Sequence, residues 1–505
     1  MARIQTRPYD SLTRDWSWHD VAVKIIDLDA AELSSAIHHR SVSCREVMTA
    51  YLDRIDERNG ALNAIVSLRD RDELLTEARK CDDELSRGTS RGWMHGFPHA
   101  VKDLAETKGL LTTKGSPILA NNVPDHDALQ VARIREAGAI IIGKTNVPEF
   151  GLGSNTFNPV FGSTANPYDV TKVAGGSSGG AAVALATRMV PVADGSDFMG
   201  SLRNPAGWCN VVGYRPSFGR VPAYPSTDSY STLCATEGPM GRKVIDVAML
   251  LGTQAGWDSR VPTSLPGSLT EFSSFASCAS HLAGTMNGAR IGWLGDLGGH
   301  LPTEAGMLEI CESALRRMTA DGAEIETVDL NVDLDALWLS WLHNRHAYNA
   351  ATYGPLLSRD SLAEQLKPEV RWEAESGMVL SALDLKRAAT VRTSFYERIS
   401  SMFRSGGGTF DLLALPTAQV WPFDIEMRWP HEVAGRAMDT YHRWMECTIY
   451  ATYAGLPAIS MPAGFSPCGR PAGIQLIGSP LNDVSVLRYA AAYERLIEDL
   501  NVGEA

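Results

Sequence analysis

A chain of 505 residues is long enough for one large domain or for two to three smaller ones. Its hydrophobic content of 44% and charged content of 21% are those of an ordinary soluble globular protein. A net charge of −13 argues against nucleic-acid phosphates as the main partner and favours a neutral or weakly polar small molecule.

The eight cysteines include no Cys-x-x-Cys pair, so the sequence contains no metal or redox motif of that kind. Their scatter is typical of reduced thiols in a cytoplasmic protein. No segment reaches the roughly 18 apolar residues of a membrane span, and residues 1–20 lack the apolar core of a signal peptide. We therefore expect a cytoplasmic protein without a membrane partner.

Residues 1–26 are polar and rich in tryptophan, and they predict an arm on the surface. Capping signals then mark the helices, because Asp29 can cap one helix and residues 43–46 form a capping box for the next. The expected order is a helix from Asp29 to about Arg40, a helix from residue 44 to 59, a strand at 64–68 and a charged helix at 69–87.

A short apolar strand over Pro98–Val101 ends at Lys102. A lysine in this place is usually a solvated strand end. In an apolar setting, however, desolvation lowers the pKa of a lysine and turns it into a usable base. Lys102 is therefore a candidate catalytic residue.

Two serine-bearing loops, at residues 175–180 and 194–201, flank an expected helix at 181–189 and a buried strand at 190–193. Glycine-rich loops let the backbone approach another group and direct N–H groups at it. The loops indicate a nucleophile and an anion-stabilising pocket. Plain turns are an alternative, as is a nucleophile elbow at Ser177 that needs an Asp and a His. A phosphate-binding P-loop is disfavoured because no Gly-Lys-Ser/Thr ending is present.

Apolar strands and helices alternate along the remaining chain, which favours an α/β fold with a sheet buried on both faces. The expected elements are helices at 127–137, 303–320, 335–403 (mostly helical) and 484–498, strands at 139–142, 211–214, 291–294, 325–330, 412–415, 458–461 and 473–477, a loop over the site at 151–172 and a linker at 263–280.

Four motifs with their spacing resemble those of the amidase signature family: the segments 96–103, 175–180, 197–206 and 213–219. The resemblance covers nearly the whole chain. It implies a single α/β/α domain with a large, twisted, mostly parallel or mixed central sheet. Residues 27–505 would form that domain, with the catalytic core at about 64–250 and a substrate lid at about 335–450.

The resemblance also implies a Ser–cis-Ser–Lys triad. Ser201 matches the nucleophile, Ser177 the bridging serine and Lys102 the base, so no His is required. The implied chemistry needs no metal and no other cofactor. The backbone N–H groups that match the family's oxyanion hole are those of Phe198, Met199, Gly200 and Ser201.

Met199 departs from the family pattern, which usually has glycine at this position, and we expect its side chain to line the acyl pocket. Positions that match supporting residues around the site are Ser178, Asp197 and Arg203. The candidate substrate-binding residues are Met199, Trp208, Phe150, Trp338, Trp341 and Tyr348. Aromatic residues at helical spacing are more often core, but those of residues 338–348 are also suited to a lid over an apolar substrate.

The leading hypothesis is an amide hydrolase for a neutral, fairly apolar amide, anilide or carbamate. The main alternative is the amidotransferase subunit that supplies ammonia to misacylated tRNA, which shares these motifs. A non-catalytic binding protein on the same fold is a third reading, disfavoured by the presence of all three triad residues. The expected partners are a small-molecule amide and, as a further candidate, a second copy of the chain.

Overall fold

The computed structural model describes residues 24–230, 234–267, 269–272, 274–500 and 505. Residues 1–23 of the expected arm lie outside the described residues. The strands are β1 (Ile65–Val66), β2 (Pro98–Lys102), β3 (Ile140–Thr145), β4 (Phe157–Asn158), β5 (Gly162–Ser163), β6 (Ala193–Asp197), β7 (Val212–Arg215), β8 (Thr236–Gly241), β9 (Arg290–Trp293), β10 (Glu324–Thr327), β11 (Leu412–Pro416), β12 (Glu432–Val433), β13 (Arg436–Ala437), β14 (Ala458–Phe465) and β15 (Pro471–Gly478).

Eight strands form one mixed sheet in the order β10-β9-β11-β15-β14-β7-β8-β6. Strands β10 and β11 run parallel to β9, whereas the other neighbouring pairs of this sheet are antiparallel. A second sheet has the order β1-β3-β2, with β2 parallel to β3. Strand β2 packs beside β6, so the two sheets meet where the first candidate residue, Lys102, is located.

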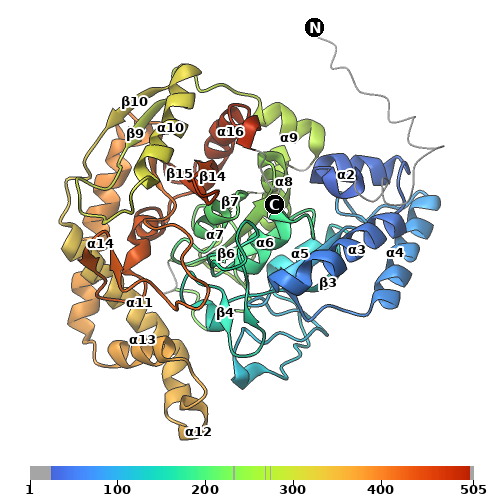
Figure 1. Cartoon of the computed structure of the whole chain (residues 1–505), viewed down its shortest axis with the longest axis horizontal. Helices are drawn as coiled ribbons and strands as arrows, with labels where there is room; N and C mark the ends of the chain where they lie inside the picture. Colours follow the sequence, from blue (N-terminus) through green and yellow to red (C-terminus); the bar gives the residue numbers. More distant parts are fainter. Residues whose placement is uncertain (1–23, 231–233, 268, 273, 501–504) are drawn as a thin grey trace.

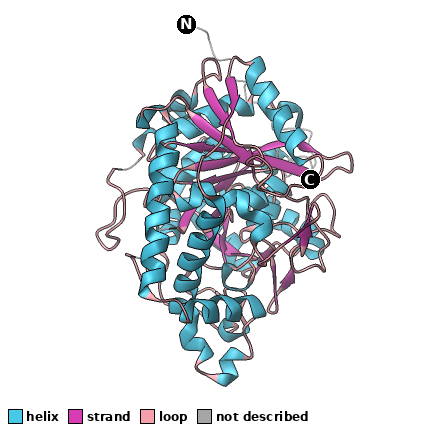
Figure 2. Ribbon diagram, turned by 90° about the vertical axis from the view of Figure 1, so that its left-hand side faces the viewer, coloured by secondary structure: helices cyan, strands magenta, loops and turns pink. Residues whose placement is uncertain are grey.

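The helices cover both faces of the large sheet. Ile474 and Leu476 of β15 lie in the hydrophobic cluster formed with α10 and α16, while Gln475 between them bonds to Arg203 of α7. Because side chains alternate along a strand, α7 lies on the opposite face from α10 and α16. Figure 2 shows the strands with helices on either side, which confirms the α/β expectation.

The helices begin with α2 (Ala30–His38) and α3 (Cys44–Leu62), whose capping boxes at Asp29 and Ser43 are both formed. The others are α4 (Arg71–Ser86), α5 (Leu129–Glu136), α6 (Gly179–Ala186), α7 (Arg203–Trp208), α8 (Val244–Gln254), α9 (Phe275–Leu282), α10 (Met307–Ala320), α11 (Leu334–Leu357), α12 (Asp360–Ala363), α13 (Pro368–Met378), α14 (Ala382–Met402), α15 (Ile449–Tyr453) and α16 (Asp483–Glu494).

Helix α6 lies at the centre of the molecule, and every one of its residues is buried. Its sequence of Gly, Ala, Val and Leu is apolar on all sides, as a fully enclosed helix requires. The helix joins the two serine-bearing loops and packs against β6, β3 and β2. The small side chains let those strands approach closely, and this brings both loops to the end of β2.

Several expected boundaries need correction. The strand expected at 190–193 begins only at Ala193, because Pro191 has no N–H to offer a sheet. The linker expected at 263–280 contains helix α9, whose N-cap Ser274 accepts a hydrogen bond from the Ser277 N–H. The helix expected at 303–320 begins at Met307.

Helix α11 packs on both α13 and α14, and the three form most of the expected lid region, with α12 projecting from the body at the bottom of Figure 1. In the described part of the chain, no helix is both long enough and apolar enough to span a membrane.

Candidate active site

Lys102 ends β2 with its side chain buried, at 1% exposure. Its Nζ donates to Ser177 Oγ at 2.9 Å, Ser178 Oγ at 2.7 Å and Ser196 Oγ at 2.9 Å, with the Ser196 carbonyl oxygen at 3.2 Å. An ammonium group has three N–H donors, whereas a neutral amine has two and a lone pair. Since hydroxyl groups can donate or accept, this setting accommodates either form of the lysine.

Burial lowers the pKa of Lys102 from its ordinary value to about 8, against the opposing effects of Glu237, Asp194 and Asp197. Neighbouring carboxylates therefore reduce the shift without cancelling it. The side chain of Asp103, the next residue, faces elsewhere and accepts hydrogen bonds from Thr113. A lysine with this pKa is partly neutral near pH 8, which a proton acceptor requires.

The first serine loop places Ser177 and Ser178 on the lysine just before α6. The peptide bond between Gly176 and Ser177 is cis. Gly175 has a φ of 81°, and a Cβ there would lie 2.7 Å from Asn204 Oδ1 and 2.9 Å from Pro205 Cα. The loop therefore rests directly on α7, at a position where only glycine fits.

The second loop follows β6 and carries Ser201, which is 5% exposed. The Ser178 N–H donates to the Ser201 carbonyl oxygen at 3.2 Å, so the two serine loops are bonded through their backbones. Gly200 has a φ of 80°, and a Cβ there would lie 2.6 Å from Thr448 Cγ2. The Gly200 N–H donates to Asp197 Oδ1 at 2.9 Å, so this N–H is not free for an oxyanion.

Asp197 holds the second loop through a fully buried network. Its carboxylate accepts two hydrogen bonds from Arg203, at 3.0 Å each, and one from Arg215 at 3.1 Å. Burial raises the pKa of Asp197, but the two guanidinium groups outweigh it and hold the pKa well below its usual range. Arg203 continues to Gln475 Oε1 and Thr452 Oγ1, which ties the loop to β15 and α15.

An aromatic wall stands beside the second loop. The ring centroid of Phe198 lies 5.6 Å from that of Trp341 and 5.4 Å from that of Tyr348, both from α11. The Arg345 guanidinium lies over the Phe198 ring at 5.3 Å and bonds to Glu373 and Tyr441. Residues far apart in the sequence thus meet where an oxyanion N–H, that of Phe198, is expected.

Four other candidate substrate residues are placed differently. Trp208 is fully buried, stacks on Trp444 at 5.6 Å and donates to the Val420 carbonyl oxygen, so it belongs to the core. Met199 is 1% exposed and packs in the same hydrophobic cluster, rather than facing an open pocket. The extra side chain is accommodated there because its backbone φ is not positive, so glycine is not required.

Trp338 packs under the Arg443 guanidinium at 4.4 Å and beside His442, with no contact to the Phe198 ring. Phe150 packs on Tyr353, at 4.8 Å between ring centroids. The residue after it, Gly151, is the closer neighbour of the serines, because a Cβ there would lie 3.5 Å from Ser177 Oγ. The expected loop at 151–172 therefore begins beside the site.

Sequence reasoning missed Ser196, Glu237 and Arg215. Ser196 lies in the 194–201 segment, two residues after Asp194. Side chains two residues apart on a strand lie on the same face, so this spacing was a usable signal. Glu237 comes from β8, which only the sheet order places beside β6, and Arg215 comes from β7, one strand further, from which it reaches Asp197.

One group of side chains has the spacing of a metal site: Cys81, Glu84 and His95, whose ligand atoms all lie within 4.8 Å of one another. The partners of these atoms do not favour a metal there. Both ring nitrogens of His95 are in hydrogen-bond contact with backbone groups, and Glu84 pairs with Arg91. Burial raises the pKa of the Cys81 thiol to about 11.

A family model described as Amidase matches residues 46–487 of this chain. Among curated proteins, the A subunit of the glutamyl-tRNA(Gln) amidotransferase from Azoarcus sp. (strain BH72) is 34% identical over 496 residues, covering 93% of this chain and 98% of that protein.

Solved structures give a second comparison. The chain is similar to a bacterial aryl acylamidase of the amidase signature family, with a TM-score of 0.86 and 28% identity over 94% of this chain and 98% of the other. It is also similar to the A subunit of the glutamyl-tRNA(Gln) amidotransferase from Thermotoga maritima, with a TM-score of 0.69 and 28% identity over 95% of this chain and 96% of that one.

Proposed function

The chain belongs to the amidase signature family, whose members act on amide C–N bonds, and from this membership we propose that it hydrolyses a neutral, fairly apolar amide through an acyl-enzyme on Ser201. The observation that carries the proposal is the bond from Lys102 Nζ to Ser177 Oγ at 2.9 Å, in a site where the pKa of the lysine is lowered to about 8.

The first chemical step is activation of Ser201. A serine hydroxyl is a weak nucleophile until a base takes its proton. Neutral Lys102 accepts the proton of Ser177, which in turn accepts that of Ser201, and Ser201 Oγ then forms a bond to the amide carbonyl carbon. The buried setting of all three residues favours this relay, because water does not compete for the transferred proton.

The second step is collapse of the tetrahedral intermediate. The N–H groups of Phe198, Met199 and Ser201 are the proposed oxyanion donors, and one well-placed donor stabilises the transition state by about 3–4 kcal/mol. Ser177 returns a proton to the leaving nitrogen, and the C–N bond breaks. Water then attacks the ester at Ser201 and releases the acid.

The aromatic wall supports an aryl-bearing substrate. Phe198, Trp341 and Tyr348 present ring surfaces beside the second loop, and aromatic pairs contribute about 0.5–1.5 kcal/mol beyond the area they bury. The TM-score is higher to the aryl acylamidase than to the amidotransferase of Thermotoga maritima, which agrees with an anilide or aryl amide.

Ammonia supply within a tRNA amidotransferase is the second candidate, and the curated relatives of that name favour it. Its chemistry is the same hydrolysis, applied to the side-chain amide of glutamine. The two candidates differ in substrate and in partners. Release of ammonia from glutamine, together with copurification of two further subunits, would favour the amidotransferase.

The test combines a substrate panel with active-site labelling. The purified protein is assayed on anilides, aliphatic amides, carbamates and glutamine, and we expect the highest kcat/KM for an anilide or aryl amide. A serine-directed fluorophosphonate followed by peptide mass spectrometry should place the adduct on Ser201. Ser201→Ala should lose activity by at least about 10³-fold, since triad residues act as a unit. An adduct on Ser177, with Ser201→Ala still active, would overturn the proposal.

A further inference from the structure

Glu237 is a carboxylate beside the proposed base that the relay does not use. It lies on β8, directly opposite Ser196 of β6 in the antiparallel pair. Directly opposed residues of such a pair place their side chains on the same face, with Cβ atoms about 4.5–5.5 Å apart. The Ser196 hydroxyl bonds to Lys102 Nζ, so the Glu237 side chain leaves the sheet on the side of the lysine.

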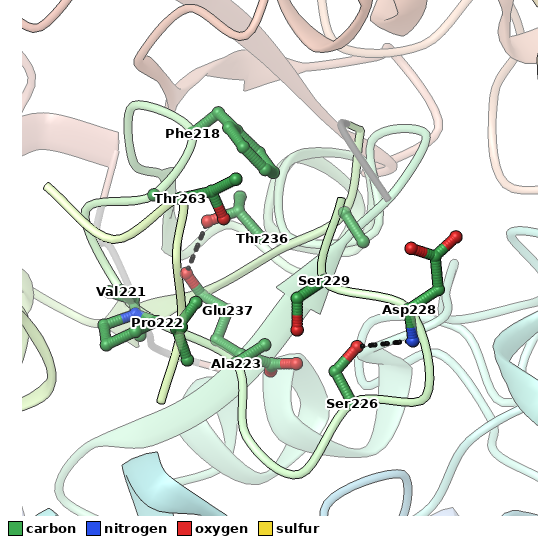
Figure 3. Close-up of a pocket in the computed structure, with 13 residues that line it drawn as sticks. Phe218, Val221, Pro222, Ala223, Ser226, Asp228, Ser229, Thr236, Glu237 and Thr263 are labelled. Carbon is green, nitrogen blue, oxygen red and sulfur yellow. Dashed lines mark hydrogen bonds between the residues drawn. The ribbon is translucent and has the colours of Figure 1, made fainter. Parts of the chain in front are cut away.

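The Glu237 side chain also borders a small cavity of about 60 Å³. Figure 3 shows it on one side of this cavity, with Ser226, Asp228 and Ser229 across from it. Glu237 is only partly buried, and no described residue forms a hydrogen bond or ion pair with its carboxylate. A cavity of this size admits water but is far below the roughly 300–1,000 Å³ of a small-molecule site. The cavity is therefore a water-sized space beside Glu237 rather than a substrate pocket.

Other charged groups near this corner already have partners. Asp194 accepts from the Lys102 backbone N–H and lies 3.0 Å from His99 Nε2, and Asp197 is neutralised by its two arginines. The charged groups that act on Lys102 or Glu237 are Asp194 and Asp197 of β6, and Glu237 in turn acts on Tyr348 of α11, as do Arg345 and Asp228. Asp228 lines the same cavity as Glu237, and His99 of β2 contacts Asp194. Among the described residues, Glu237 is the carboxylate here whose charge is not otherwise balanced.

We propose that Glu237 is a positioning residue of the relay: across the β6–β8 pair it stabilises the ammonium form of Lys102 and so sets the pH at which the lysine becomes a base. The proposal rests on the proposed function, because it takes Lys102 as the base. Among the described residues, no hydrogen bond joins the Glu237 carboxylate to Ser177 or Ser201. Glu237 acts on the lysine through the electrostatic attraction between a carboxylate and an ammonium group.

The titration of the two groups supports this reading. Among the charges that act on Lys102, Glu237 has the largest effect and raises its pKa against the lowering caused by burial. Burial raises the pKa of Glu237 to about 7, which Lys102 opposes. Removing the negative charge at position 237 should therefore lower the pKa of Lys102 further. More of the lysine would then be neutral between about pH 7, above which Glu237 is ionised, and pH 8.

The experiment compares kcat/KM against pH for the wild type, Glu237→Gln and Asp228→Asn, using the best amide from the panel. Glutamine keeps the size of the side chain and removes its charge, and Asp228→Asn removes a carboxylate from the same cavity away from β8. We expect the rising part of the kcat/KM profile of Glu237→Gln to move to lower pH by about one unit, the size expected for one nearby opposite charge. Because Glu237 is itself protonated below its pKa of about 7, activity should rise mainly between pH 7 and 8 and the two profiles should converge below pH 7, while the high-pH plateau should stay within about threefold. Asp228→Asn should keep the wild-type limb.

A second measurement avoids any dependence on substrate: the rate of inactivation by a fluorophosphonate against pH. The same downward shift is expected for Glu237→Gln, with circular dichroism showing that the variant is folded. A wild-type limb that Lys102→Ala abolishes but Glu237→Gln leaves in place would overturn this inference and spare the proposed function. A limb that persists in Lys102→Ala would overturn the proposed function itself. If Asp228→Asn shifts the limb as much as Glu237→Gln does, the effect belongs to the cavity as a whole and the specific role of Glu237 fails.

Discussion

At the scale of single residues, the chemistry depends on one lysine that is kept partly neutral by burial while four oxygen atoms surround its amine. The protein holds a second lysine of the same kind, because burial also lowers the pKa of Lys144 to about 8. Lys144 Nζ bonds to the Ala105 carbonyl oxygen and to Thr107, away from the serines. The two lysines form a matched pair for testing which one is the base.

We predict that kcat/KM rises with pH through a value near 8 and then levels off. The neutral amine is the base, so protonation below the pKa of Lys102 removes activity. Lys102→Ala and Lys102→Arg should both lose at least about 10²-fold, the usual contribution of a general base. Arginine fails because its guanidinium stays protonated. Lys144→Gln should keep the rise of kcat/KM with pH. Loss of that rise in Lys144→Gln, with the rise kept in Lys102→Ala, would contradict the assignment of Lys102 as the base.

A second prediction concerns Asp197. Asp197→Asn leaves two buried guanidinium groups without their carboxylate, and breaking a buried ion pair costs about 3–5 kcal/mol. The pKa of Asp197 is depressed in the fold, so its contribution is fully present above the ordinary pKa and is lost as pH falls through the depressed value. The destabilisation should therefore be constant between pH 6 and 9. Urea unfolding measures it, with the exposed Asp125→Asn as the control that changes little.

At the scale of the element, α6 shows how closely the central parts are packed. A Cβ at Gly180 would lie 2.3 Å from the Asn146 backbone nitrogen and 2.5 Å from the Ala64 carbonyl oxygen. Both obstacles are main-chain atoms of the small sheet and cannot swing aside. The helix therefore begins with two glycines because the strand ends lie against it.

Gly180→Ala should accordingly destabilise the fold by at least 1–3 kcal/mol, the usual cost of overpacking. Gly60 gives the opposite case, since it lies in α3 with nothing within 4 Å of a built Cβ. Gly60→Ala should stabilise by about 0.5–1 kcal/mol, because alanine loses less backbone entropy in a helix. Thermal melting of both variants tests the pair, and equal effects would contradict the packing argument.

Helix α11 supplies the next prediction. Tyr348→Ala removes a ring from the wall beside Phe198, and a lost hydrophobic pocket contact costs about 1–3 kcal/mol in kcat/KM. We expect the KM for aryl amides to rise by about 10-fold or more, with fluorophosphonate labelling of Ser201 unchanged. Tyr396→Ala on α14, where the tyrosine is 43% exposed, should leave KM within about twofold. A KM unaffected by Tyr348→Ala would place the substrate elsewhere.

The sequence foretold the elements whose signals are local. The helix cap at Asp29, the capping box at Ser43, the strand that ends at Lys102 and the two serine-bearing loops all follow from neighbouring residues. Sequence patterns could not predict which residues from distant parts of the chain lie next to each other in the fold. Trp208 is of a residue type common in binding pockets, but it stacks on Trp444 in the core. Glu237 comes close to the proposed base only because β8 lies beside β6.

Some predicted ends of strands and helices were wrong for physical reasons that the periodicity of apolar residues does not reveal. Pro191 delays the start of β6, and the Ser/Pro-rich stretch at 263–280 hides helix α9 because its N-cap serine resembles a loop residue. The lid helices were expected from residues 335–403 as a group, but the meeting of Trp341 and Tyr348 with Phe198 depends on how α11 packs.

At the scale of the whole molecule, the two ends of the described chain are fastened near one another. Glu494 of α16 accepts a hydrogen bond from the Val244 N–H at the start of α8, at 2.8 Å. Asp246 of the same helix accepts from the Ala30 N–H at the start of α2, also at 2.8 Å. Burial raises the pKa of Glu494 to about 7 and that of Asp246 well above its ordinary value. This closure of the fold therefore depends on pH.

A carboxyl group whose pKa is raised on folding favours the folded state while it is protonated. The stabilisation by Glu494 is fully present below its ordinary pKa near 4.5 and is lost as pH rises through about 7. Glu494→Gln keeps the acceptor oxygen and removes the ionisation, so we predict a higher Tm than wild type at pH 8 and an equal Tm at pH 4.5. Melting curves at the two values test this, and a difference that does not depend on pH would contradict it.

The residues proposed to break the amide bond and the residues proposed to select the substrate belong to different stretches of the chain. Lys102, Ser177 and Ser201 lie within the first half, whereas Trp341 and Tyr348 of α11 lie against the ring of Phe198 in the second serine-bearing loop. Helix α11 also bonds to residues outside the 334–402 region, Ser340 to Tyr453 and Arg345 to Tyr441. We expect that a graft of residues 334–402 from a relative, made together with these partner positions, would carry over the donor's range of amides while the recipient kept its own pH dependence.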